Sequence, residues 1–133
     1  MKDKIKTQIR HSIETKEGVL QSCVTDIAKS VQLILDSIKS NGKVLWCGNG
    51  GSAADAQHLS TELMGGMTNH ERKPIPSLAL TTDSSFLTAW SNDTDFNSVF
   101  SRQIQGLGRP GDVLFAITTS GNSENVIAAV RQA

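Results

Sequence analysis

Hydrophobic residues in the first forty positions recur at helical spacing. A spacing of four predicts a weakly amphipathic helix over residues 2–20, with a narrow stripe of Ile5, Ile9 and Ile13. From about Thr25 the pattern strengthens and predicts a second helix, whose face comprises Val24, Ile27, Ala28, Val31, Ile34, Leu35 and Ile38. Asn41-Gly42 offers the left-handed residue that ends such a helix. We expect this helix pair to close one face of a sheet, and its remaining apolar stripe to pack against a second subunit.

Three continuous apolar runs follow and alternate with helical patterns. The runs predict strands at 43–47, 77–82 and 113–117, each buried on both faces. The helical patterns cover residues 53–64, 86–90, 96–107 and the segment that carries Val126, Ile127 and Val130. This alternation predicts an α/β fold, a doubly wound parallel sheet in a flavodoxin-like three-layer arrangement.

The length of 133 residues fits one domain, with the helix pair at 1–41 and the parallel α/β core at 43–133. A hydrophobic content of 38% is enough for a packed core. The last helical pattern stops without glycine, proline or a cap, and three strands are few for this architecture. We therefore expect a domain truncated at its C-terminus, whose natural form continues.

Charge and cysteine usage exclude several classes of function. With 13 basic and 13 acidic residues, the chain has no net field to hold a nucleic acid. The charged N-terminus is unlike a signal peptide, and no apolar run reaches membrane-spanning length. Cys23 and Cys47 fall in apolar, periodic surroundings that favour buried thiols over a disulfide or a metal pair. We expect a cytoplasmic protein without a nucleic-acid or membrane partner.

Two strand-to-helix turns carry the candidate chemistry. After the first strand, glycines in the segment 48–52 let the backbone approach a ligand, and Ser52 is placed to cap the next helix. After the third strand, the segment 118–123 gathers four hydroxyls, those of Thr118, Thr119, Ser120 and Ser123. One helix cap needs one hydroxyl, so this excess favours a phosphate site. The first turn also fits G-x-G-x-x-A, but the acidic residue of a dinucleotide site has no good counterpart.

A histidine and a carboxylate follow on the helix after the first turn. His58 and Glu62 are four apart and so project from one face, the spacing of two metal ligands on a helix. Asp55 lies three residues before His58 on the same side. An ordinary solvated ion pair is the alternative interpretation. Since a structural zinc takes four ligands, others must come from a missing segment or from another subunit.

Taken together, CGNGGSAADAQH with Glu62, LALTTD, Asn92-Asp93, GRPGDVL and TTSGNS resemble the sugar isomerase (SIS) domain family, and within it the phosphoheptose isomerases. The resemblance covers almost the whole chain. It implies an aldose–ketose isomerase that converts sedoheptulose 7-phosphate to D-glycero-D-manno-heptose 7-phosphate, a precursor of bacterial lipopolysaccharide heptose. It also implies a homotetramer with active sites between subunits.

The resemblance assigns roles to individual residues. Glu62 matches the catalytic carboxylate, and His58 with Glu62 matches two zinc ligands. The substrate contacts that it implies are Asn49, Gly50, Gly51, Ser52, Glu62, Asn92, Asp93, Thr118, Thr119, Ser120 and Ser123. Where the family often has an arginine after the helix of the catalytic glutamate, this chain has Gly66. The family's glutamine and histidine that complete the site fall in the expected missing segment.

Two other functions compete with the enzyme. A non-catalytic member of the family binds the replication initiator as a scaffold, and a regulatory domain senses a sugar phosphate without converting it. The metal-spaced pair of His58 and Glu62 favours the enzyme, because a scaffold does not need one.

Overall fold

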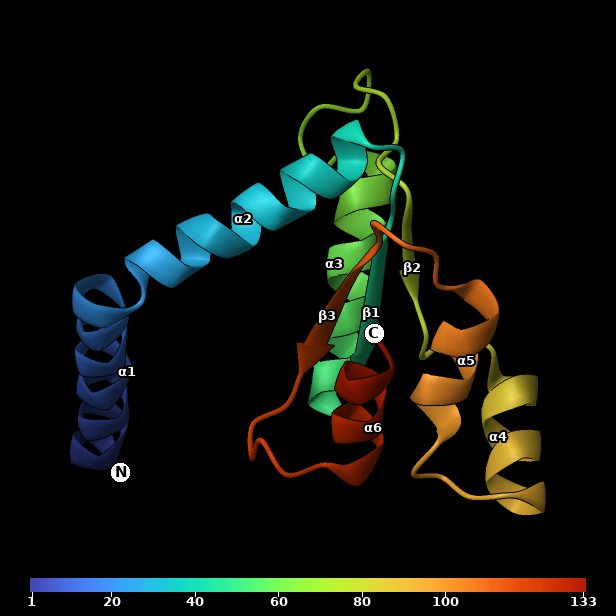
Figure 1. Cartoon of the computed structure of the whole chain (residues 1–133). Helices are drawn as coiled ribbons and strands as arrows, with labels where there is room; N and C mark the ends of the chain where they lie inside the picture. Colours follow the sequence, from blue (N-terminus) through green and yellow to red (C-terminus); the bar gives the residue numbers. More distant parts are fainter. The chain divides into compact units, whose positions relative to one another are not determined.

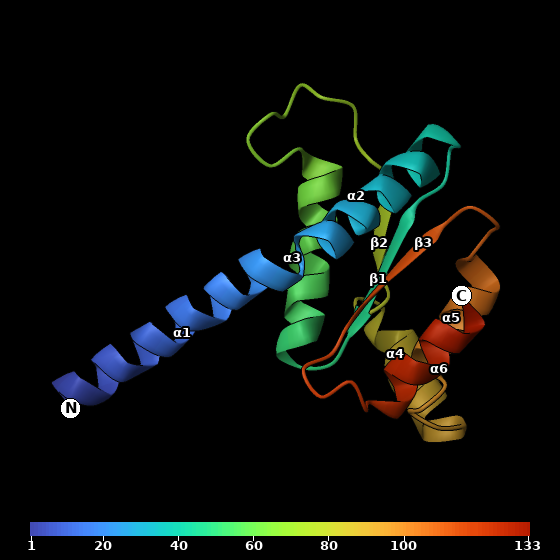
Figure 2. The same cartoon turned by 60° about the vertical axis from the view of Figure 1, so that its left-hand side comes forward.

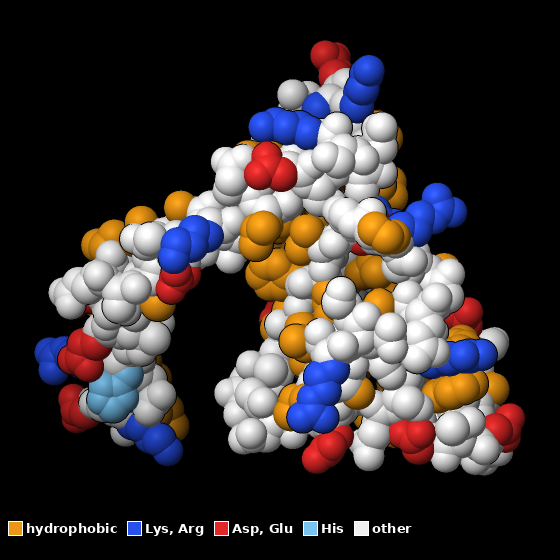
Figure 3. All heavy atoms as spheres, in the orientation of Figure 1, with side chains coloured by type: hydrophobic (Ala, Val, Ile, Leu, Met, Phe, Trp, Pro, Cys, Tyr) orange, Lys and Arg blue, Asp and Glu red, His pale blue; other side chains and the backbone are white.

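A computed structural model describes residues 1–133, which form two compact units, Met1–Leu35 and Asp36–Ala133. Helix α1 (Lys2–Ser22) and most of helix α2 (Val24–Lys39) make up the first unit. The expected helix pair is thus confirmed, and its stripe residues, including Ile5 and Ile9, are exposed. Figure 3 shows hydrophobic side chains along these helices. None of the helices has the combined length and hydropathy that a membrane span requires.

The second unit is built on a three-stranded parallel sheet in the order β2-β1-β3. Its strands are β1 (Val44–Gly48), β2 (Ser77–Ala79) and β3 (Val113–Ile117). Its helices are α3 (Gly51–Gly65), α4 (Ser84–Asp93), α5 (Val99–Leu107) and α6 (Glu124–Gln132). In Figures 1 and 2, α3 lies on one side of the strands and α5 and α6 lie on the other. The predicted doubly wound α/β fold is confirmed.

Alternate residues of β1 face two different packing layers. Leu45 and Cys47 join the main core cluster with residues of α5 and α6, namely Val99, Phe100, Ile104, Val126 and Ala129. Burial there raises the pKa of the Cys47 thiol to about 11. On the α3 side, Trp46 Nε1 donates to Ser77 Oγ (2.8 Å), which donates to Ser60 Oγ (3.0 Å). This chain of hydrogen bonds satisfies the polar atoms beneath α3.

Several expectations for individual elements are corrected. Strand β2 ends at Ala79 rather than at residue 82, because Thr82 Oγ1 donates to the carbonyl of Ala79 and closes a turn. Strand β3 pairs only with β1, and Phe115 on it is 37% exposed, so it is not buried on both faces. Cys23 is half-buried rather than buried.

The helices before β3 also differ in extent from the prediction. Helix α4 covers Ser84–Asp93 rather than residues 86–90, since the carboxylate of Asp83 caps it by accepting from the amide of Phe86 (3.0 Å). Helix α5 begins at Val99 rather than at residue 96. The preceding residues form a turn in which Asp95 accepts hydrogen bonds from the amide and the hydroxyl of Ser98.

A partly buried ion pair joins the start of β1 to the turn before β3. The Asp112 side chain is 9% exposed and accepts hydrogen bonds from Lys43 Nζ, the amide of Lys43 (2.9 Å) and the amide of Arg109 (2.8 Å). Burial alone would raise the pKa of Asp112, but these hydrogen bonds and the Lys43 charge outweigh it and lower the pKa. Asp112 therefore stabilises the fold mainly as a carboxylate.

Replacing Asp112 by alanine should lower the free energy of unfolding by about 3 kcal/mol at pH 7, because an ammonium and two amides lose their acceptor. Since the folded pKa lies below the unfolded one, this contribution is complete above about pH 4 and is lost as the pH falls through the folded value. Urea unfolding at pH 7 and pH 3 measures both effects. Asp26→Asn, which removes an exposed partner of Lys29, is the control and should change stability by less than about 1 kcal/mol. An Asp112 variant as stable as the control would contradict this prediction.

Candidate active site

The two predicted turns lie at the same rim of the sheet. Gly48, which ends β1, is paired in register with Ile117, which ends β3. Both strands are parallel and adjacent, so the segments that follow them leave the sheet side by side. Each segment then enters a helix, α3 after the first turn and α6 after the second.

The glycine turn presents unpaired backbone donors. Gly50 has φ +56° and ψ −119°, a conformation that side chains rarely adopt, and it is the N-cap of α3. Ser52 was predicted as the cap but lies within the first turn, because the helix begins at Gly51; no side chain caps α3. The amides of Gly50 and Gly51 have no acceptor within the chain. They therefore remain available to a ligand at the positive end of the helix.

The hydroxyl turn is held by hydrogen bonds among its own residues. Thr118 Oγ1 lies 3.3 Å from Ser123 Oγ and accepts from the amide of Gly121 (3.2 Å). Ser120 Oγ accepts from the amide of Asn122 (3.1 Å). Ser123 is the N-cap residue of α6, yet its hydroxyl makes no capping hydrogen bond. Four hydroxyls thus lie beside a helix start without serving as its cap.

Sequence reasoning missed one residue at this rim, Asn125 of α6. Its Nδ2 donates to Asn49 Oδ1 (2.8 Å), and Asn49 Nδ2 donates to Asn125 Oδ1 (2.9 Å). Asn125 is only 3% exposed. The sequence does contain a signal for this residue. Asn125 is a polar residue on the inner face of α6, whose other buried residues, Val126 and Ala129, are apolar.

His58 and Glu62 lie together on α3, as predicted. His58 Nε2 is 3.9 Å from Glu62 Oε1, and the two side chains are 73% and 31% exposed. Two ligands of one tetrahedral zinc lie about 3.3 Å apart, so a small rotamer change fits the pair to a shared ion. No third His, Cys, Asp or Glu gathers with them. The chain thus supplies at most half of a zinc site here.

The pair is distant from the two turns of its own chain. Glu62 lies ten residue steps after Ser52 along the helix, which is about 15 Å at the α-helical rise. The helix runs back along the sheet, so Glu62 lies toward the opposite rim. A seven-carbon sugar phosphate spans roughly 10 Å from phosphorus to its first carbon, given bond lengths near 1.5 Å. To reach Glu62 of the same chain, a bound sugar would have to extend along most of α3.

Asn92 and Asp93 form a third group, at the end of α4. Asn92 Nδ2 donates to Asp93 Oδ1 (2.8 Å), and both residues are exposed. Helix α4 packs on α5 through its aromatic residues, with Arg102 above the Trp90 ring at 5.0 Å. The structure thus brings the two turns together and places the other two groups elsewhere on the chain.

The glycine at position 66, where the family often has an arginine, is explained by the local backbone. It ends α3 with φ +102°, and a Cβ there would lie 2.4 Å from the carbonyl oxygen of Asn69. Arg72 folds back instead, and its Nη2 donates to the carbonyls of Glu62 (2.6 Å) and Leu63 (2.7 Å). A cation thus lies at the helix end that carries Glu62.

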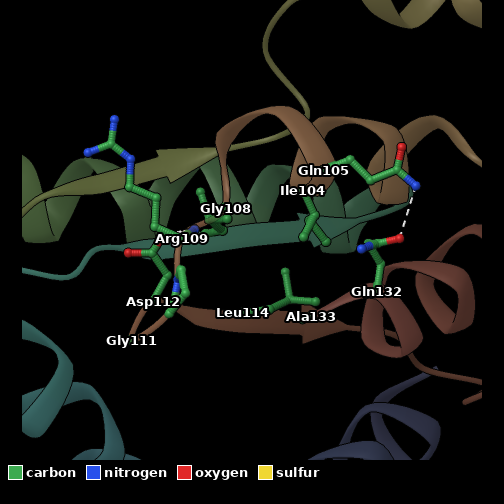
Figure 4. A pocket seen from close by; sticks show the side chains of 11 residues that line it. Ile104, Gln105, Gly108, Arg109, Gly111, Asp112, Leu114, Gln132 and Ala133 are labelled. Atoms are coloured by element: carbon green, nitrogen blue, oxygen red, sulfur yellow. Dashed lines mark hydrogen bonds between the residues drawn. The ribbon is translucent and has the colours of Figure 1, made fainter.

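One cleft lies away from all these groups. It holds about 450 Å³ and is lined by the turn 108–112 with Leu114, Gln132 and Ala133, at the rim from which β3 starts (Figure 4). Gln105 Nε2 donates to Gln132 Oε1 (2.9 Å) across its edge. Asp112 already has its partners, and the Arg109 side chain points away. The cleft offers no group for acid–base chemistry.

Comparison with known proteins decides the family. The SIS domain family matches residues 8–133. The chain belongs to the SIS domain family. Among SIS proteins, it is 50% identical to the phosphoheptose isomerase of Azoarcus sp. (strain BH72) over 131 residues, which are 98% of this chain and 66% of the relative. It is 47% identical over 133 residues to that of Shewanella sediminis, covering 100% of this chain and 67% of the relative.

Solved SIS structures show the same fold. The phosphoheptose isomerase of Neisseria gonorrhoeae superposes with a TM-score of 0.92 at 44% identity, over 99% of this chain and 68% of that one. The phosphoheptose isomerase of Francisella tularensis gives 0.94 at 38% identity, over 98% of this chain and 68% of that one. The chain thus spans about two thirds of the length of the relatives it matches.

Proposed function

We propose that this SIS chain acts as an isomerase on sedoheptulose 7-phosphate, yielding D-glycero-D-manno-heptose 7-phosphate for surface heptose. One observation carries the proposal: helices α3 and α6, which follow the adjacent strands β1 and β3, start at one rim of the sheet without side-chain caps. Clustered hydroxyls and unpaired amides surround these starts, as a phosphoryl group requires. The choice of substrate rests on the similarity to phosphoheptose isomerases.

Phosphate capture is the task of the two turns. The amides of Gly50 and Gly51 and the hydroxyls of Ser52, Ser120 and Ser123 donate to the phosphoryl oxygens. Thr118 and Thr119 line the same turn. Holding the phosphate fixes one end of the sugar, so that the reacting carbons meet the base in one orientation.

Glu62 acts as the base of the isomerisation. Its carboxylate removes a proton from C1 of the ketose, and the electron pair moves to the C2 carbonyl oxygen to give an enediolate. Transfer of the O1 proton to O2, and return of the proton from Glu62 to C2, then give the aldehyde at C1 and the hydroxyl at C2. General base catalysis of this kind contributes about 10²- to 10⁴-fold.

His58 and Glu62 would hold the zinc in this proposal. A zinc held by these two residues would supply Lewis-acid stabilisation of negative charge on the substrate's oxygens. Because the chain offers two ligands, the others come from a further segment or from another copy. Glu62 would then have to serve as a metal ligand and as the base, or alternate between the two roles.

The active site is shared between copies in a homotetramer, which reconciles the separation of the three groups. In such an assembly, the two turns of one copy would hold the phosphate of the sugar. Glu62 and the Asn92–Asp93 pair that contact the same sugar would come from neighbouring copies. The exposed apolar stripe of α1 and α2 supports such an assembly, because water-exposed isoleucines at Ile5, Ile9 and Ile13 favour burial against a partner.

An assay of the purified protein with sedoheptulose 7-phosphate tests the function. Aldose formation, followed with zinc added and with zinc chelated, should exceed the uncatalysed rate in one of the two conditions. Phosphate binding is measured in parallel by NMR titration with inorganic phosphate. A sensing domain would bind without turnover, and a scaffold would do neither, so either result would refute the enzyme.

A further inference from the structure

The Asn49–Asn125 pair joins the two turns of the proposed phosphate site. Asn49 precedes the N-cap of α3, and Asn125 is in the first turn of α6. Two reciprocal hydrogen bonds, of 2.8 and 2.9 Å, connect their side-chain amides across a sequence distance of 76 residues. Among the hydrogen bonds of the rim, these alone run from one turn to the other.

Reciprocity makes the connection rigid. Each amide gives one N–H and one carbonyl oxygen to the other, so rotating either group by half a turn would oppose donor to donor and acceptor to acceptor. Asn125 is 3% exposed, and a buried amide without partners is unfavourable. The pair therefore fixes the distance and the orientation of one helix start against the other.

We propose that Asn125 is a positioning residue that aligns the two turns on one phosphoryl group, an inference that rests on the proposed function. Asn125 acts through Asn49 and does not touch the ligand. Its buried amide holds the glycine turn so that the amides of Gly50 and Gly51 face the hydroxyls of the second turn. Asn49 keeps one N–H and one lone pair for the sugar.

The test compares Asn125→Leu with Ala129→Gly in the complete chain. Leucine keeps the branching of asparagine at Cγ, in a somewhat larger side chain, but cannot form its hydrogen bonds. Ala129→Gly instead weakens the same helix at a buried position away from the pair. NMR spectra of the free protein are recorded first. Asn125→Leu should shift or broaden the amide signals of Gly50, Gly51 and Gly121, and Ala129→Gly should leave them in place. Unchanged signals in Asn125→Leu would overturn the proposal.

Titration with inorganic phosphate follows, at a temperature where both variants are folded. Asn125→Leu should lose about tenfold in affinity, the effect of a lost buried hydrogen bond, while Ala129→Gly stays within about twofold of the native chain. Equal losses in both variants would assign Asn125 a merely structural role. If the native chain bound no phosphate, the proposed function would fail, and the free-protein spectra would still decide whether Asn125 aligns the turns.

Asn125→Asp adds a rescue experiment. An ionised carboxylate at position 125 can only accept, so it opposes the carbonyl of Asn49. A protonated carboxyl has one donor and one acceptor and restores the reciprocal pair. Burial raises a carboxyl pKa, so the introduced carboxyl should become protonated as the pH is lowered from about 7 to about 5. Over this interval, the phosphate affinity of the Asn125→Asp variant should rise relative to that of the native chain at the same pH. A ratio that stays constant with pH would contradict the reciprocal arrangement.

Discussion

Replacing Glu62 by glutamine is expected to reduce isomerase turnover by about 10²- to 10⁴-fold, because an amide cannot take the proton from C1. The variant should stay folded, since the Glu62 side chain is 31% exposed and its recorded carboxylate contact is with His58 at 3.9 Å. The initial rate of aldose formation at saturating substrate measures the effect.

Phosphate affinity should be almost unchanged in the Glu62→Gln variant. The turns that hold the phosphate lie about 15 Å away along α3. Glu71→Gln is the matched control, because it makes the same chemical change at an exposed loop carboxylate close in sequence. We expect native turnover in the control. Native turnover in Glu62→Gln as well would show that another group is the base.

Zinc binding supplies a second readout for the same variant. If Glu62 and His58 share an ion, Glu62→Gln should weaken zinc binding, as loss of a charged oxygen ligand does. Calorimetry with zinc on the native chain and on the variant measures this directly. Equal affinities would remove Glu62 from the metal site and leave its role as a base to the turnover experiment.

The fold was predictable from the sequence for those elements whose buried residues leave a regular hydrophobic pattern. Continuous apolar runs located β1 and β3, and glycines at the turns located the starts and ends of α3. Strand β2 was overestimated because Leu80 continues the apolar run while Thr82 turns the chain by bonding to Ala79. Such a side-chain-to-backbone bond leaves no trace in a hydrophobic pattern.

The candidate site was predictable only in part. Parallel strands place their following turns at one rim, so the meeting of residues 48–52 with 118–123 follows from topology alone. The capping role of Ser52 was wrong because Gly50 and Gly51 can themselves start a helix, which moves the serine inside it. The Asn49–Asn125 pair depends on side-chain directions in two elements 76 residues apart, which no local pattern contains.

Gly48 is where the geometry of the first turn is most sensitive. A Cβ on this residue would lie 2.7 Å from the carbonyl oxygen of Ser52 and 2.8 Å from its Cβ. Contacts this short are repulsive, and the opposing atoms are mostly backbone in the first turn of α3, which cannot move aside by a rotamer change. The close approach of β1 to α3 thus requires glycine.

Replacing Gly48 by alanine should therefore lower the free energy of unfolding by about 3 kcal/mol, the upper range for overpacking a close contact. For a chain of this size the melting temperature should fall by roughly 10 °C. Phosphate affinity should fall too, because the first turn of α3 must shift away from the hydroxyl turn. Thermal unfolding and phosphate titration below the transition measure the two effects.

Gly106→Ala is the matched control, the same substitution on the exposed side of α5 with no atom within 4 Å of the added carbon. Alanine is favoured over glycine inside a helix, so the control should be as stable as the native chain or more stable by up to about 1 kcal/mol. We therefore expect the free energy of unfolding to fall in Gly48→Ala and to stay level or rise in Gly106→Ala. The prediction would be contradicted if Gly48→Ala had the same melting temperature and the same phosphate affinity as Gly106→Ala. That result would mean that β1 and α3 can move apart without a loss of stability, and that the turn between them is not preorganised for an anion.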